Sequence, residues 1–160
     1  MAAPTPSVPV TPGGIKLKDG FSAKVVFSLD TDASLWVKTA TPPPLEMGDA
    51  IDQTTMWNET YVTKAIQALI DVGNGQFTCA YDPNVYNNVI AMMGPTKEQT
   101  ITWVFSDGST LCHYGFIKNF VPGAMSRGAQ PEATVEVVCT NWDPSGKVEA
   151  APVLTSVSGT

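Results

Sequence analysis

The sequence predicts a mainly β domain: an antiparallel β-sandwich or partly closed barrel flanked by one α-helix. Three features predict it. Apolar residues alternate with a period of two in several segments, one segment has a helical period, and an Asp-Gly pair separates two alternating runs. The chain has 160 residues, of which 43% are hydrophobic, so we expect one domain with a substantial core.

Four segments alternate between apolar and polar residues, which is typical of strands that bury one face. They cover residues 21–29, 77–81, 101–105 and 133–139. In the last of them the apolar face consists of Ala133, Val135, Val137 and Cys139. Because an open antiparallel sheet leaves strand edges, we expect those edges to be protected or used in assembly.

The segment Ser106–Ser109 has the composition of a tight turn, with Asp107 and Gly108 at its centre. Asp-Gly between two alternating runs favours a type I′ turn, in which both central residues need a positive φ. We therefore expect a β-hairpin that joins Gln99–Phe105 to Thr110–Phe120.

One segment has the period of an amphipathic helix instead, with apolar residues at i, i+4, i+7 and i+8. These residues are Val62, Ile66, Leu69 and Ile70. Asn58 or Thr60 is the expected N-cap, and Gly73 or Gly75 is the expected end. A second, shorter helical turn is expected after Asp82, where a proline occupies the first helical position.

Composition divides the chain into three parts. Residues 1–14 hold four prolines and end in two glycines, so we expect an extended, proline-rich N-terminal arm that builds no core. Residues 143–160 are small and polar and are expected to form a C-terminal tail. The folded domain is therefore expected at residues 15–142, with the proline-rich Thr41–Pro44 as a loop or an exposed edge.

The charge balance argues against nucleic-acid binding. The net charge is −6, and Arg127 is the only arginine, whereas proteins that bind nucleic acids need clustered lysines and arginines. Charged residues make up only 15% of the chain, compared with about 25% in an ordinary domain. This deficit indicates that partners cover part of the surface. We find no signal peptide and no apolar run long enough to span a membrane.

Residue types that form catalytic or metal sites are few and badly spaced. The single histidine, His113, alternates with Cys112, so the two side chains should point to opposite faces of a strand. Asp30–Ser34 is similar to the start of a calcium loop, but Leu35 stands where that loop needs glycine and Thr41 where it needs glutamate. We therefore expect no catalytic residue, no cofactor, no metal and no enzymatic activity. Free, buried thiols and folding in a reducing cytosol are expected for Cys79, Cys112 and Cys139.

The order of several segments resembles the tail tube (major tail) proteins of long-tailed, non-contractile bacteriophages. The segments are MGDAIDQTT, then YVTKAIQALIDVG, GQFTCAYDPN, QTITWVFSDGSTLCHYGFIKNFVP and finally PEATVEVVCTN. That family commonly has a Gly-Asp-x-Ile-Asp-like segment before its helix, a strand ending near Asp-Pro, a hairpin turned by Asp-Gly-Ser and a final strand. The resemblance covers about residues 15–142.

The resemblance implies a phage tail tube fold whose copies close into six-subunit rings, which stack into a hollow tube. Genome DNA would leave the capsid through this acidic conduit without specific binding. Implied partners are the chain itself and the tape measure, tail tip or distal tail, and tail terminator proteins. The implied location is the tail of the virion, assembled in the bacterial host cytoplasm.

For contacts between rings or subunits, the candidate segment is Thr41–Met47, with the residues Pro42, Pro43, Pro44, Leu45 and Met47. Asp49 and Asp52 are candidate acids of the lumen or of an interface, and we favour this role over a general acid because no cleft is evident around them.

Two alternatives remain open. The chain is also compatible with the inner tube of a contractile injection or secretion machine, which would share the fold. A different class is a monomeric β-sandwich module that binds carbohydrate or a surface ligand, for which Trp36 or Trp57 would supply an exposed aromatic platform.

Overall fold

The computed structural model describes residues 4–6, 23–30, 37–106 and 108–156. Most of the expected N-terminal arm, most of the calcium-loop-like segment, Trp36 and Asp107 lie outside these residues. The described chain is mainly β and contains one helix, as the sequence predicts.

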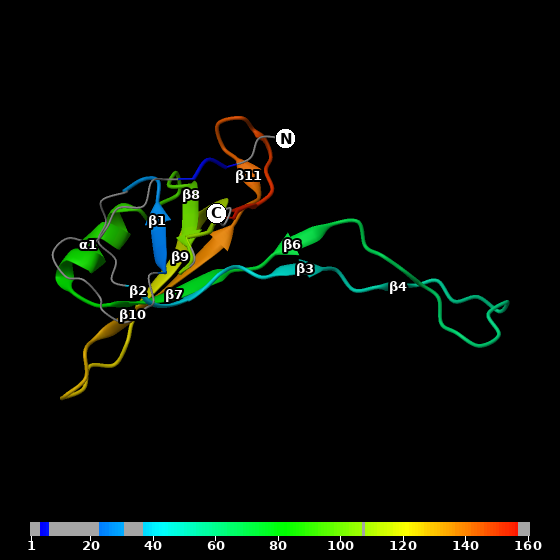
Figure 1. The fold of residues 1–160 in the computed structure, drawn as a ribbon, viewed down its shortest axis with the longest axis horizontal. Helices are drawn as coiled ribbons and strands as arrows, with labels where there is room; N and C mark the ends of the chain where they lie inside the picture. The colour runs from blue at the N-terminus through cyan, green and yellow to red at the C-terminus, as the bar shows by residue number, and fades with distance from the viewer. Residues whose placement is uncertain (1–3, 7–22, 31–36, 107, 157–160) are drawn as a thin grey trace.

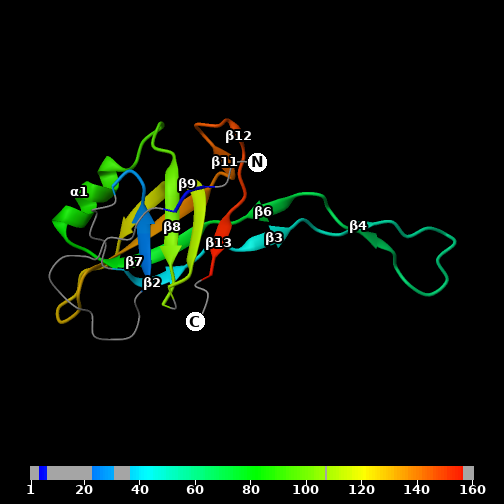
Figure 2. The ribbon, with the colours of Figure 1, turned by 45° about the horizontal axis from the view of Figure 1, so that its top comes forward.

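Seven strands form the main sheet, and all of their pairings are antiparallel (Figures 1 and 2). Six follow the order β1–β8–β9–β10–β7–β2, and β13 pairs with β9. Their bounds are β1 Lys24–Phe27, β2 Val37–Thr41, β7 Gly75–Ala80, β8 Gln99–Val104, β9 Thr110–Pro122, β10 Glu132–Cys139 and β13 Val153–Thr155. Because β1 and β2 lie beside one another at the two ends of this order, the sheet curls into a partly closed barrel.

The concave side of the curled sheet holds the core. Along β10, the four apolar residues expected to form one face are buried, and the residues between them are partly exposed. Aromatic rings join neighbouring regions of the core: Phe77 lies 5.9 Å from Phe27 and 6.1 Å from Trp103, measured between ring centroids. The period-two pattern therefore predicted the buried face of this strand correctly.

Strand β9 is the longest and changes partners along its length. One edge pairs with β8 over residues 110–115, while the other pairs first with β13 and then with β10. Gly115 lies where these pairings meet, opposite both Gln99 and Cys139. A Cβ atom on Gly115 would lie 2.1 Å from the carbonyl oxygen of Val138, so only glycine fits here.

The hairpin between β8 and β9 is present, but its turn is longer than predicted. Val104 lies opposite Thr110, and the Phe105 N–H donates to the Ser109 carbonyl. The loop therefore has three residues instead of two. The Gly108 N–H donates to the Phe105 carbonyl at 3.0 Å and closes a turn, and Gly108 itself has a positive φ of 86°.

The prediction of a main helix over residues 62–70 is wrong, because this segment belongs to a long β-hairpin. The helix among the described residues is α1, Pro83–Ala91, at the place of the shorter expected turn. Asp82 caps it: its Oδ1 accepts from the N–H groups of Asn84 (2.6 Å) and Val85 (3.0 Å). In the described part of the chain, no helix has both the length and the apolar character needed to cross a membrane.

The last segment, expected as a tail, contains three short strands. Strand β11 (Trp142–Asp143) pairs with β12 (Val148–Glu149). The turn between them is closed by Asp143, whose Oδ1 accepts from the N–H and the hydroxyl of Ser145 at 2.9 and 2.7 Å. These bonds lower the pKa of the Asp143 carboxyl. Residues up to 155 thus lie against the sheet through β13.

Candidate assembly surface

A long hairpin projects from one edge of the barrel, and we call residues 42–74 the hairpin arm (Figures 1 and 2). Its pairs are β3 (Leu45–Met47) with β6 (Ile70–Val72), and β4 (Ile51–Asp52) with β5 (Lys64–Ala65). The arm prolongs the β2–β7 pair of the main sheet. It therefore starts from a fixed base but extends well beyond the core.

The surface of the hairpin arm is rich in large apolar side chains. At the tip, Met56, Trp57 and Tyr61 are 102%, 92% and 82% exposed. The exposed set along the arm comprises Leu45, Met47, Ile51, Met56, Trp57, Tyr61, Val62, Ile66, Leu69 and Ile70. Single exposed apolar residues are ordinary, but such a concentration on one projection is typical of an interaction surface.

Polar groups inside the tip hold its shape. The Asn58 side chain is central: its Oδ1 accepts from the Thr55 N–H at 2.8 Å, and its Nδ2 donates to the Thr63 hydroxyl at 2.6 Å. Asn58 Nδ2 also donates to the Tyr61 carbonyl, and the Thr63 N–H donates to the Thr54 hydroxyl. The polar groups are thus paired within the arm, which leaves its apolar side chains to face outward.

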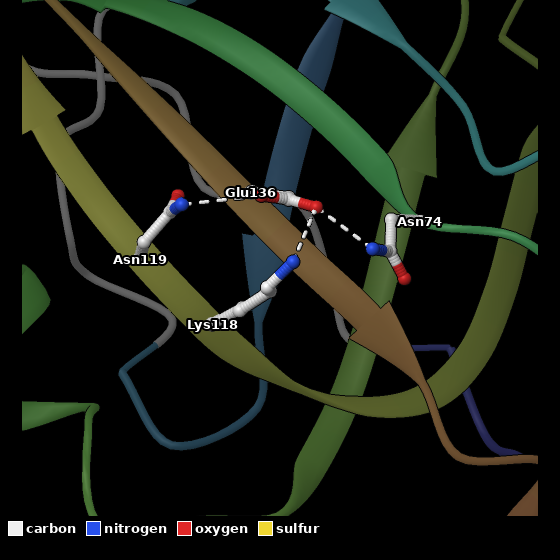
Figure 3. Close-up of polar contacts among 4 residues, drawn as sticks. All are labelled: Asn74, Lys118, Asn119 and Glu136. Carbon is white, nitrogen blue, oxygen red and sulfur yellow. Dashed lines mark hydrogen bonds and ion pairs between the residues drawn. The ribbon is translucent and has the colours of Figure 1, made fainter.

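The base of the arm is tied to the outer face of the sheet. Figure 3 shows Glu136 of β10 accepting from Asn74 Nδ2 at 2.7 Å, Lys118 Nζ at 3.2 Å and Asn119 Nδ2 at 3.1 Å. The bond from Asn74, followed by that from Lys118, lowers the pKa of the Glu136 carboxyl. Since Asn74 ends the arm, this cluster joins the arm to two strands of the barrel.

The candidate contact residues predicted from the sequence all lie on the first half of the arm. Pro43 is buried at its base, whereas Leu45 and Met47 are 68% and 54% exposed. Pro42 is partly exposed and Pro44 is exposed. A proline has no N–H to donate, but the Pro44 carbonyl accepts from the Gly73 N–H at 2.8 Å, so the two sides of the hairpin stay paired here.

The two candidate acids, Asp49 and Asp52, are exposed on the same half of the arm. Asp52 Oδ1 accepts from the Thr54 N–H at 2.8 Å, and hydrogen bonding by Thr54 lowers the pKa of this carboxyl. The arm carries five acidic residues and one lysine, a net charge of −4 out of −6 for the chain. It is therefore both apolar and acidic.

The sequence pattern missed part of the tip and the second half of the arm surface, with the residues Met56, Tyr61, Val62, Ile66 and Leu69. Three of these were assigned, with Ile70, to a helix or its surroundings because of their spacing. The sequence contained a contrary signal: the run Thr60–Thr63 consists of β-branched and aromatic residues, which favour strands over helices.

The histidine expected to be structural connects three strands in the interior. The Trp103 indole N–H of β8 donates to His113 Nε2 at 2.8 Å, which leaves the proton of the neutral ring on Nδ1. Nδ1 lies 3.2 Å from both the Tyr114 carbonyl oxygen and Cys139 Sγ. Burial lowers the pKa of His113 and raises that of the Cys139 thiol to about 12. Among the described residues, no three His, Cys, Asp or Glu side chains form a group suited to a metal ion.

No protein-family model matches the chain, and a comparison with curated proteins finds no match. Solved structures do share its fold. A chain of the anti-feeding prophage baseplate, in a six-fold symmetrised structure, matches with a TM-score of 0.58 and 9% identity over 99% of both chains. A chain from the tail of an empty GTA particle, refined with C6 symmetry, matches with a TM-score of 0.56 and 6% identity, over 90% of this chain and 100% of that one. At these identities the likeness is one of fold, and the chain has a fold also found in a prophage baseplate and a particle tail.

Proposed function

We propose that the protein is a structural subunit of a phage tail tube, which self-assembles into stacked rings of six copies. The observation that carries this proposal is the hairpin arm, which presents ten large apolar side chains on a preorganised projection. The six-fold assemblies that contain chains of the same fold support it. The resemblance of the sequence to tail tube proteins supports it independently.

The exposed area of the arm is large enough to drive assembly. Fully burying one such side chain stabilises a complex by roughly 1.5–3 kcal/mol. Burying half of the ten therefore contributes roughly 8–15 kcal/mol, which is comparable with the roughly 4–15 kcal/mol that association costs. One arm contact is thus near balance. A closed ring, in which every copy both gives and receives an arm, accumulates these contacts and becomes stable.

The charge suits a conduit for DNA. A wall of like-charged subunits repels phosphates within a Debye length of about 8 Å at physiological salt. At a net charge of −6 per subunit, a tube would let genome DNA pass without binding it. Asp49 and Asp52 are our candidates for acids of the lumen or an interface. Pro42, Pro43, Pro44, Leu45 and Met47 are our candidates for contacts between rings or between subunits.

In this proposal the protein is located in the virion tail and assembles in the host cytoplasm, around a tape measure protein. Its other partners would be the tail tip or distal tail and tail terminator proteins. The second candidate is the inner tube of a contractile injection or secretion machine, and a fold shared with a chain of the anti-feeding prophage baseplate is compatible with it. A sheath protein that co-purifies with the assembled tube would favour this second candidate.

The test is electron microscopy and analytical ultracentrifugation of the purified protein, with and without tail tip proteins. We expect six-fold rings or tubes, and we expect the double variant Met56→Ser, Trp57→Ser to remain monomeric at concentrations at which the wild type assembles. The control is Leu154→Ser, which removes another exposed apolar side chain (65%) on β13, outside the arm. A wild-type protein that stays monomeric with its partners present would overturn the proposal. Glycan binding lost in Trp57→Ser would then favour a carbohydrate-binding module.

A further inference from the structure

A second exposed apolar surface lies at the end of the molecule opposite the hairpin arm. We call it the receiving end. It is formed by α1 and the β9–β10 hairpin, whose loop is residues 123–131. Tyr86 and Ile90 of α1 and Met125 of the loop are 41%, 48% and 66% exposed.

The two elements of the receiving end are packed against each other. The Tyr86 ring of α1 lies edge-on to Phe120 of β9, with 5.7 Å between centroids. Phe120 also contacts Tyr81, which precedes the helix, at 6.2 Å. These contacts hold the helix against the side of β9 that carries Phe120, at the base of the β9–β10 hairpin.

Charge distinguishes the two ends. The hairpin arm has a net charge of −4, whereas the loop 123–131 carries one charged residue, Arg127, which is exposed. Within the described part of the chain, Arg127 forms no ion pair, and neither do Asp49 and Glu59 of the arm. An arginine beside exposed apolar groups is the composition found at the centre of protein interfaces. The receiving end thus complements the arm in both charge and polarity.

We infer that the hairpin arm of one copy binds the receiving end of a second copy, with Arg127 facing acidic side chains of the arm. This inference rests on the self-assembly proposed above and specifies its contact. Figures 1 and 2 place the two surfaces at opposite ends of the long axis, so the contact is head to tail. A head-to-tail contact leaves one free arm and one free receiving end on every pair. Repetition therefore closes a ring or continues as a helix.

Two complementary variants test the contact. The arm variant is Met56→Ser, Trp57→Ser, and the receiving-end variant is Met125→Ser, Arg127→Glu. All four side chains are exposed, so both proteins should fold, and circular dichroism and thermal unfolding verify this. Each variant alone should need at least about tenfold more protein than wild type to assemble. Mixed one to one, they should form two-chain complexes only, because one intact arm meets one intact receiving end.

Charge reversal tests the role of Arg127. Arg127→Glu should raise the concentration needed for assembly at least about tenfold, whereas Lys147→Glu, the same change on an exposed residue outside the receiving end, should leave it unchanged. Assembly should return in part when Arg127→Glu is combined with Asp49→Lys or with Glu59→Lys.

The outcomes separate this inference from the proposed function. If wild type assembles and the arm variant does not, but the receiving-end variant behaves as wild type, the receiving end is wrong and self-assembly stands. If the mixed variants fail to pair, the contact is not arm to receiving end, and an arm-to-arm contact or another protein takes its place. If wild type never assembles, the proposed function itself fails.

Discussion

Replacing Gly115 with alanine should destabilise the barrel. The new Cβ would lie 2.1 Å from the Val138 carbonyl oxygen, an atom of the backbone of β10 that no rotamer change can move. A carbon and an oxygen need about 3 Å, so β9 and β10 must separate by about 1 Å at this point. Overpacking of this kind costs about 1–3 kcal/mol.

The separation also weakens one or two backbone hydrogen bonds beside Gly115, at about 0.5–1.5 kcal/mol each. We therefore expect Gly115→Ala to lower the free energy of unfolding by about 3 kcal/mol. In a domain of this size each kilocalorie corresponds to roughly 2–4 °C in Tm, so Tm should fall by about 6–12 °C. The expectation depends on the register of β9 against both of its neighbours.

The assay is urea unfolding followed by circular dichroism, in the Met56→Ser, Trp57→Ser background, so that assembly does not contribute to the apparent stability. Gly128→Ala is the matched control. Its φ is 83° and its Cβ would contact nothing within 4 Å, so only the backbone conformation costs energy, about 1 kcal/mol. If Gly115→Ala costs no more than Gly128→Ala, the close approach of β9 and β10 is refuted.

Three further changes test other parts of the fold. Burial lowers the pKa of His113 below 6.5, so on acidification the unfolded chain binds a proton that the folded chain does not. The free energy of unfolding should therefore fall as the pH drops below about 6.5. Urea unfolding at pH 7.5 and 5.5 measures this fall, and His113→Gln should remove the contribution of the histidine to it. Asp82→Ala removes the cap of α1 and should cost about 1 kcal/mol in the same assay, whereas no change would mean that the cap bonds contribute nothing. Burial raises the pKa of the Cys79 thiol to about 11 and that of the Cys139 thiol to about 12. Both thiols should therefore resist iodoacetamide at pH 8 in the folded protein and react with it in urea. Rapid labelling without urea would contradict their burial.

The sequence predicts best those elements that bury one face against the rest of the same chain and expose the other face. Strand β10 is the clearest case, because Val135 and Val137 face the core while Glu136 faces out, and the alternation records that difference. The predicted β8–β9 hairpin is also present. Its turn differs because Val104 pairs with Thr110 and the Phe105 N–H pairs with the Ser109 carbonyl, which leaves three loop residues, and this strand register is a tertiary property.

The hairpin arm shows where sequence reasoning fails. Val62, Ile66 and Leu69 have helical spacing, but they are exposed, so no packing within the chain selected that spacing. An apolar stripe in a sequence indicates that the face carrying it is buried. It does not indicate whether the same chain or a partner buries that face. The prolines and acidic residues of the first half of the arm are recognisable in the sequence as candidate contact residues. The second half has the apolar spacing of an ordinary amphipathic helix, so its role in a surface is not recognisable from the sequence.

The composition of the arm also bears on how uncontrolled pairing is avoided. A long, apolar hairpin edge invites other strands to pair with it, and proteins limit this with short strands and charged residues. The paired segments of the arm are two or three residues long, and its net charge of −4 makes two arms repel each other. Arm-to-arm contact is thereby disfavoured, while contact with a surface that carries Arg127 is not. In the proposed tube, the acidic residues that would suit a DNA conduit would also give the apolar arm a preference for the opposite end of a neighbouring copy, and we expect this preference to weaken as salt screens it.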